Sequence, residues 1–63
     1  MHKIVVTDIE IIYPEGFSEK SRRSGLTEPI TASEAAIQAE KYRRWDDSIL
    51  EIRAYNGADY WLI

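Results

Sequence analysis

A cluster of basic and hydroxyl side chains at residues 19–25 is the part of this sequence best suited to bind an anion. These residues read EKSRRSG. Arginine makes bidentate hydrogen bonds to phosphate and carboxylate groups, so Lys20, Arg22 and Arg23 are candidate contacts for a phosphoryl group or an acidic partner. No GxxxxGK[ST] sequence is present, so the cluster is not a P-loop. The nearby acidic residues that weaken its positive field are Glu15, Glu19 and Glu28.

Catalytic and metal chemistry find little support in the sequence. Asp46 and Asp47 are paired carboxylates, but adjacent side chains point in different directions and no third carboxylate lies at ligand spacing. The only histidine is His2, next to the start methionine, so no serine has a credible partner for a catalytic triad. The chain has no cysteine and therefore no thiolate metal site. We expect no enzymatic activity, no catalytic residues, no metal site and no cofactor.

The basic cluster belongs to a polar segment of sixteen residues, Pro14 to Pro29. This segment holds both prolines and two of the three glycines, and its only large apolar residues are Phe17 and Leu26. So long a connection in a small domain is typical of a binding segment or of disorder. We predict that residues 14–30 form a long polar loop within a single small domain that spans residues 1–63.

Composition excludes several classes of protein. With 44% hydrophobic and 30% charged residues, the chain resembles a soluble globular protein. A domain of this length buries only about 60% of the surface of its unfolded chain. The apolar runs are too short to span a membrane, and acidic residues arrive too early for a signal peptide. Together with the absence of cysteine, this predicts a cytoplasmic protein. The net charge of −3 argues against general attraction to nucleic acid.

Lys3 to Tyr13 predicts the first strand, because the segment is rich in β-branched residues. Side chains alternate between the two faces of a strand. The face without charge is the expected core face and carries Val5, Thr7, Ile9, Ile11 and Tyr13. The other face carries Ile4, Val6, Asp8, Glu10 and Ile12.

Thr31 to about Trp45 predicts a helix. Thr31 and Glu34 match a capping box, and Pro29 lies just outside it. Basic residues near the end suit the helix macrodipole. The expected apolar stripe is Ala32, Ala35, Ala36, Ala39 and Tyr42, with Ile37 or Trp45 at its margin. Because the stripe is mostly alanine, we expect the helix to lie close to a sheet.

Ile49 to Ile63 predicts a hairpin in which Asn56-Gly57 forms a type I′ turn. A two-residue turn at this position places Ile52 opposite Trp61 on the face toward the helix, where both should form the core. The open face then carries Glu51, Arg53, Tyr55, Tyr60 and Leu62. A four-residue loop keeps these faces, whereas a three-residue loop exchanges them.

The order of elements is therefore β-α-β-β. If each element reverses direction, the first strand is antiparallel to the last, which is apolar on both faces and suits the centre of a sheet. We predict an α+β fold in which a three-stranded antiparallel sheet carries one helix packed on one face. The other face of the sheet stays open.

The open face predicts a small non-enzymatic protein-interaction module, either an inhibitor or an accessory factor, that acts by binding a partner protein. Tyrosine and arginine are enriched at protein contacts. The predicted partner-binding residues are Lys20, Arg22, Arg23, Arg53, Tyr55, Tyr60 and Leu62. Uncovered apolar and tyrosine side chains in so small a domain also predict a homodimer.

In size, acidity and economy the chain resembles the small phage and mobile-element proteins that disable host defences, such as anti-CRISPR proteins. This is a likeness of class, and no motif carries it. The alternative function is nucleotide or phosphoryl-ligand binding, with the basic cluster on the phosphate and a tyrosine stacked on the base. Duplex DNA binding by the sheet is a third interpretation. The acidic residues expected on that face argue against it: Asp8, Glu10 and Glu51.

Overall fold

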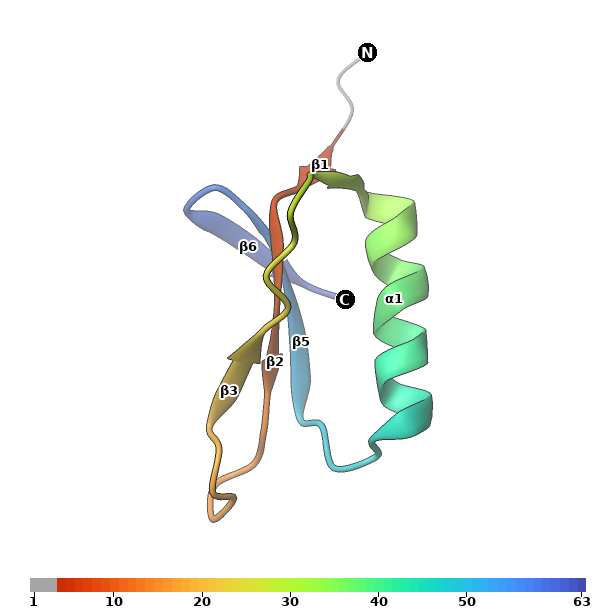
Figure 1. The fold of residues 1–63 in the computed structure, drawn as a ribbon. Helices are drawn as coiled ribbons and strands as arrows, with labels where there is room; N and C mark the ends of the chain where they lie inside the picture. Colours follow the sequence, from red (N-terminus) through yellow and green to blue (C-terminus); the bar gives the residue numbers. More distant parts are fainter. Residues whose placement is uncertain (1–3) are drawn as a thin grey trace.

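The computed structural model describes residues 4–63 and has an α+β fold, as predicted. Helix α1 (Ala32–Trp45) lies along one side of a four-stranded antiparallel sheet of order β3-β2-β5-β6 (Figure 1). These strands are β2 (Asp8–Ile12), β3 (Ser21–Arg23), β5 (Glu51–Asn56) and β6 (Asp59–Leu62). A second sheet pairs β1 (Val5–Val6) with β4 (Ile30–Thr31) beside the start of α1. His2 and Lys3 lie outside the described residues.

The predicted three-stranded sheet is wrong, because the polar segment 14–30 supplies strands of its own. The chain turns back after β2 and forms β3 along its edge. The Tyr13 amide donates to the Lys20 carbonyl at 2.9 Å, and the Ser24 amide donates to the Ile9 carbonyl at 2.8 Å. Beyond β3 the segment is anchored by Leu26 and Ile30, which pack against the core. The three residues of β3 form a strand because they pair with β2, since Ser-Arg-Arg has little strand propensity of its own.

Because β3 turns the chain back along β2, every later element runs opposite to its predicted direction. Since β3 runs antiparallel to β2, the chain enters α1 at the end of the sheet where β2 begins (Figure 1). The helix then runs in the same sense as β2, and β5 returns antiparallel to β2. The prediction that the last strand lies at the centre is therefore wrong. β5 pairs with β2, and β6 forms the edge.

The hairpin has the predicted faces but a different register. Asn56 pairs with Asp59 and Ala54 pairs with Trp61, so the turn residues are Gly57-Ala58 rather than Asn56-Gly57. Gly57 has a φ of 60°, and no other kind of residue in the described chain has a positive φ. This is the pattern of a type II′ turn, which places glycine at its first central position. The register moves by two residues along β6, and the side-chain period of two therefore leaves the faces unchanged.

The first predicted strand is interrupted at Thr7. Ile9 and Ile11 are buried as expected, but Val6 is also buried and Thr7 is exposed, so the predicted alternation fails before Asp8. The Thr7 hydroxyl accepts a hydrogen bond from the Gly57 amide at 3.0 Å. Bonding to the hairpin turn draws Thr7 out of the alternation, and Val6 and Ile9 both come to face α1.

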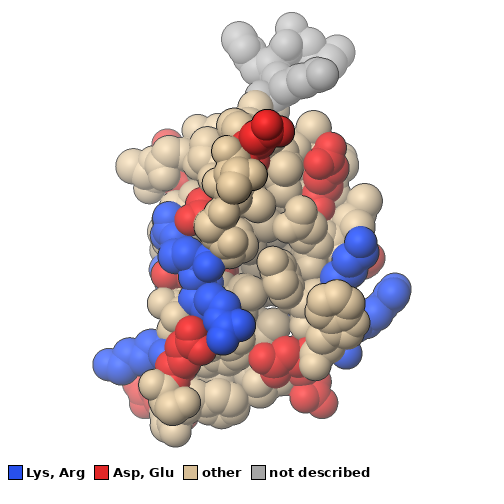
Figure 2. All heavy atoms as spheres, in the orientation of Figure 1, with Lys and Arg blue, Asp and Glu red and all other residues tan. Residues whose placement is uncertain are grey.

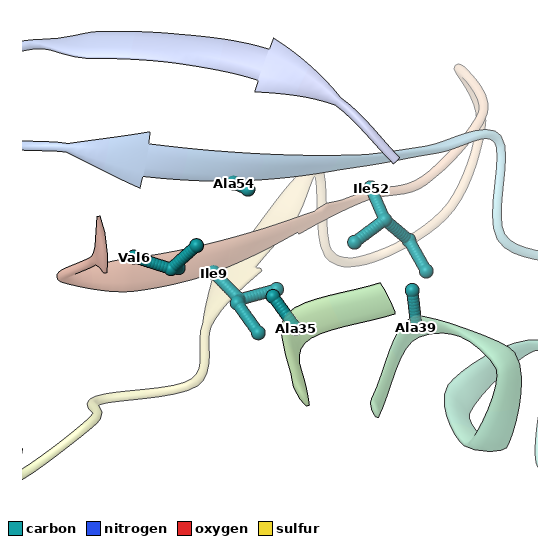
Figure 3. Close-up of a cluster of buried hydrophobic side chains, with 6 residues drawn as sticks. All are labelled: Val6, Ile9, Ala35, Ala39, Ile52 and Ala54. Atoms are coloured by element: carbon teal, nitrogen blue, oxygen red, sulfur yellow. The ribbon is translucent and has the colours of Figure 1, made fainter. Parts of the chain in front are cut away.

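The core beneath the helix is small. In Figure 3, Ala35 and Ala39 point from α1 toward Ile9 and Ile52 of the sheet. Alanine at both positions lets the helix lie close to the strands, as predicted. The buried cluster is Val6, Ile9, Ala35, Ala39, Ile52 and Ala54. It is surrounded by partly buried Leu26, Ile30, Tyr42, Ile49, Trp61 and Ile63.

The ends and the margin of α1 follow the sequence only in part. The Glu34 amide donates to the Thr31 hydroxyl at 3.1 Å, which confirms the predicted N-cap. Ala36 is exposed although it was expected in the apolar stripe, and Ile37 and Trp45 are 52% and 82% exposed. Within the described chain, α1 is not long and apolar enough to cross a membrane.

Truncation of Ile52 should destabilise the protein far more than truncation of Leu50. Ile52 is fully buried beneath the helix, whereas Leu50, two residues earlier, is 61% exposed. We expect Ile52→Ala to lower the free energy of unfolding by about 2–5 kcal/mol and Leu50→Ala to change it by less than about 0.5 kcal/mol. Urea unfolding followed by circular dichroism measures both values. Equal effects would show that the helix does not cover β5.

Candidate functional site

The side of the four-stranded sheet that faces away from α1 carries a continuous set of polar and aromatic side chains. We call this surface the open face. Strand pairing aligns its residues in rows, one of which runs across all four strands. That row contains Arg23, Glu10, Arg53 and Leu62. The next row contains Asp8, Tyr55 and Tyr60.

Glu10 lies at the centre of the open face, with a side-chain hydrogen bond to β5 and a longer ion pair to β3. The Tyr55 hydroxyl donates to Glu10 Oε1 at 2.6 Å. Arg53 Nη1 lies 3.7 Å from the same oxygen, and Arg23 Nη1 lies 4.0 Å from it. The Glu10 side chain is only 15% exposed, so these groups screen its charge from water. One carboxylate thus accepts a hydrogen bond from Tyr55 and attracts two arginines, of which Arg53 has a buried Nε without a hydrogen-bond partner.

The arginines also stack on the tyrosine rings. The guanidinium carbon of Arg23 lies 4.1 Å from the centroid of the Tyr55 ring, and that of Arg53 lies 4.6 Å from the centroid of Tyr60. Such cation–π contacts are worth about 0.5–1 kcal/mol at exposed sites. The two rings contact each other, with centroids 5.4 Å apart. Arginine and tyrosine therefore alternate across the open face up to the more exposed Tyr60 and Leu62.

Asp8 ties the return strand to the sheet. Its carboxylate accepts hydrogen bonds from Arg23 Nε at 2.7 Å, the Ile9 amide at 2.8 Å, the Ser24 hydroxyl at 3.1 Å and the Gly25 amide at 3.2 Å. Burial by itself would raise the pKa of Asp8, but the hydrogen bonds from Arg23, Ile9 and Ser24 outweigh it and lower the pKa below its ordinary value. Asp8 therefore stays ionised and holds Arg23 over the Tyr55 ring.

The two arginines of the basic cluster lie on opposite faces. Arg23 is opposite Glu10 on the open face, whereas Arg22 is opposite Ile11 on the helix side. Arg22 forms an exposed ion pair with Glu19 at 3.2 Å. Figure 2 shows basic side chains on the β3 side and on the α1 side of the molecule, with uncharged surface and, lower in the view, acidic side chains between them. The structure brings together five of the seven predicted residues, Arg23, Arg53, Tyr55, Tyr60 and Leu62, and leaves Lys20 and Arg22 apart from them.

Asp8 and Glu10 are site residues that the sequence interpretation did not assign to binding. Strand alternation did place both residues on the open face, but the sequence analysis used their negative charge only as an argument against duplex DNA binding. Their role as anchors depends on the position of Arg23, which comes from a segment predicted to be a loop. The sequence analysis therefore missed these two residues because it did not predict that β3 pairs with β2.

A hollow lies on the helix side of the sheet, between β3 and the end of α1. Its volume is about 340 Å³, and its apolar and aromatic lining is Ile11, Tyr13, Tyr42, Trp45 and Ile49. Its polar lining is Arg22, Arg23, Ser24 and Asp46. Burial, together with the nearby negative charge of Asp46, raises the pKa of Tyr13, so its phenol stays neutral. The hollow has both apolar and charged walls, and sequence reasoning missed it because those walls come from distant segments.

Comparison with known proteins gives no assignment for either surface. The chain matches no protein-family model, and no curated protein or solved structure is significantly similar to it. Within residues 4–63, no three histidine or acidic side chains are grouped so as to hold a metal ion.

Charge reversal at Arg23 should destabilise the protein, whereas reversal at the adjacent Arg22 should not. Arg23→Glu removes the hydrogen bond to Asp8 and places a third carboxylate beside Asp8 and Glu10, so we expect a loss of at least about 1 kcal/mol. Arg22→Glu disturbs one exposed ion pair and should change stability by less than about 0.5 kcal/mol. Thermal melting of the two variants measures the difference. The expectation from sequence alone, a flexible loop, gives no change for either variant.

Asp8 should make stability depend on pH in the acidic range. Its pKa in the folded protein lies below the ordinary 3.8, so the stabilisation is complete well above pH 3.8 and is lost as the pH falls through the lower folded-state pKa. Asp8→Asn should therefore be less stable at pH 7 and lose less stability between pH 5 and pH 2. Urea unfolding at several pH values tests this. Ile37→Ala, which changes an exposed side chain without a titratable group, is the control and should keep the pH profile of the wild type.

Proposed function

We propose that this protein is a small non-enzymatic interaction module, an inhibitor or accessory factor, that binds a partner protein through the open face. The observation that supports the proposal is the arginine and tyrosine arrangement of that face, which no element of the described chain covers. Large rings and guanidinium groups that are already held in place lose little conformational entropy on binding. They can therefore contribute strongly to affinity.

The chemistry of the open face indicates which partner surface would fit it. Tyr60 and Leu62 are 50% and 58% exposed and form an apolar end along β6. The rest of the face is charged: Arg23 is hydrogen-bonded to Asp8, and both Arg23 and Arg53 lie within 4.0 Å of Glu10. A fitting partner presents an apolar patch to Tyr60 and Leu62 and a polar rim to the paired charges. The class likeness to phage and mobile-element proteins extends the proposal to a component of a host defence system as the partner.

The geometry gives less support to binding of a nucleotide or phosphate by the basic cluster. Arg22 and Arg23 point to opposite sides of the sheet, and each already pairs with a carboxylate. A phosphate that bound both would have to displace Glu19 and Asp8. Only Arg23 therefore enters the proposed binding surface.

Truncation of Tyr60 on the open face should weaken partner binding without unfolding the protein. The partner is first captured from host lysate and then purified. We expect Tyr60→Ala to weaken its binding at least about tenfold. Ile37→Ala is the matched control, because Ile37 is 52% exposed on α1, away from the open face. Isothermal titration with the purified partner measures both affinities, and circular dichroism checks folding. Loss of binding in the Ile37 variant alone would move the site to the helix.

A further inference from the structure

The two edges of the four-stranded sheet differ in how they are protected. β3 has three residues, of which two are arginine. β6 reads Asp-Tyr-Trp-Leu and contains no lysine, arginine or proline. Proteins commonly guard sheet edges with charge, proline or very short strands, because unpaired backbone groups attract further strands. The β6 edge has one acidic residue at its start and is otherwise apolar.

The free backbone groups of β6 can be assigned from its pairing with β5. The Ile63 amide donates to the Ile52 carbonyl at 3.0 Å, and in an antiparallel pair hydrogen-bonded and non-hydrogen-bonded residues alternate. Trp61 therefore bonds to Ala54 of β5. Tyr60 and Leu62 direct their amides and carbonyls outward, and no other strand within residues 4–63 pairs with β6.

We propose that the β6 edge binds the β6 edge of a second copy of this chain, antiparallel and centred on Trp61. In this register Tyr60 lies opposite Leu62 of the second copy, and Leu62 lies opposite its Tyr60. Each of these two pairs exchanges two hydrogen bonds, because both residues present a free donor and a free acceptor. The two sheets become one continuous sheet with a twofold axis at Trp61.

The side chains are compatible with this pairing. On the open face, each Tyr60 ring lies beside a Leu62 side chain of the other copy, so the apolar ends of the two open faces join into one larger apolar patch. On the helix side, the two Trp61 residues lie opposite each other. Asp59 lies opposite Ile63, so like charges are not directly opposed across the new pair. The contact joins only one short strand from each copy, and we therefore expect a weak, concentration-dependent dimer.

A second copy is a suitable partner for the β6 edge because the resulting twofold dimer is a closed assembly. Pairing β6 with β6 is isologous, so both unprotected edges are used at once. The edges that remain are the two β3 strands, which are short and arginine-rich. The proposal rests on backbone groups and is thus independent of partner binding by open-face side chains. In the dimer both open faces lie on the same side of the joined sheet.

Chemical synthesis of the chain with an N-methyl group on the Leu62 amide tests the proposal. This group removes an outward donor and leaves the ladder with β5 intact. We expect wild-type protein to shift from monomer to dimer as its concentration rises in sedimentation equilibrium, and N-methylation at Leu62 to weaken dimerisation at least tenfold. N-methylation of the Ser21 amide, which points outward from β3, is the matched control and should leave dimerisation unchanged.

Amide hydrogen exchange gives a second measurement that does not depend on a variant. Exchange of the Tyr60 and Leu62 amides should slow as wild-type protein is concentrated, whereas the Trp61 amide should be protected at every concentration. A wild type that stays monomeric up to about 1 mM would overturn the proposal. So would a dimer whose Tyr60 and Leu62 amides exchange at the monomer rate, or one that N-methylation at Leu62 does not weaken. Protection that arises only when another protein is added would assign the edge to that protein instead.

Discussion

The carboxylate of Asp8 holds together the part of the chain on which the topology depends. It accepts hydrogen bonds from Arg23, Ser24 and Gly25, which follow one another as the chain leaves β3. These bonds pin the returning segment to the start of β2, so the chain reaches α1 at that end of the sheet. The direction of the helix, and with it the pairing of β5 with β2, follows from this return.

The same carboxylate links the fold to the proposed binding surface. Because Asp8 fixes the Arg23 guanidinium, that group lies over the Tyr55 ring and near Glu10 rather than in a mobile loop. The core, by contrast, relies on alanines from the helix side and is thin. On the open face, Tyr60 and Leu62 of β6 remain 50% and 58% exposed.

The two proposed contact surfaces use different groups of the same strand. Side chains of β6 complete the open face, while its outward amides and carbonyls form the sheet edge. Pairing at the edge would place two open faces side by side, which increases the area presented to a partner. β6 therefore takes part in both proposed contacts, with its side chains in one and its backbone groups in the other.

Features with local signals could be predicted from the sequence. These are the capped helix from Thr31, the outward and inward faces of the hairpin, and the polar nature of the segment before the helix. Features that depend on distant partners could not be predicted. β3 exists because β2 offers it a ladder, and Thr7 leaves its strand because its hydroxyl accepts from the Gly57 amide. Arg22 and Arg23, adjacent and alike in the sequence, were separated onto opposite faces by that ladder, since neighbouring side chains in a strand point opposite ways.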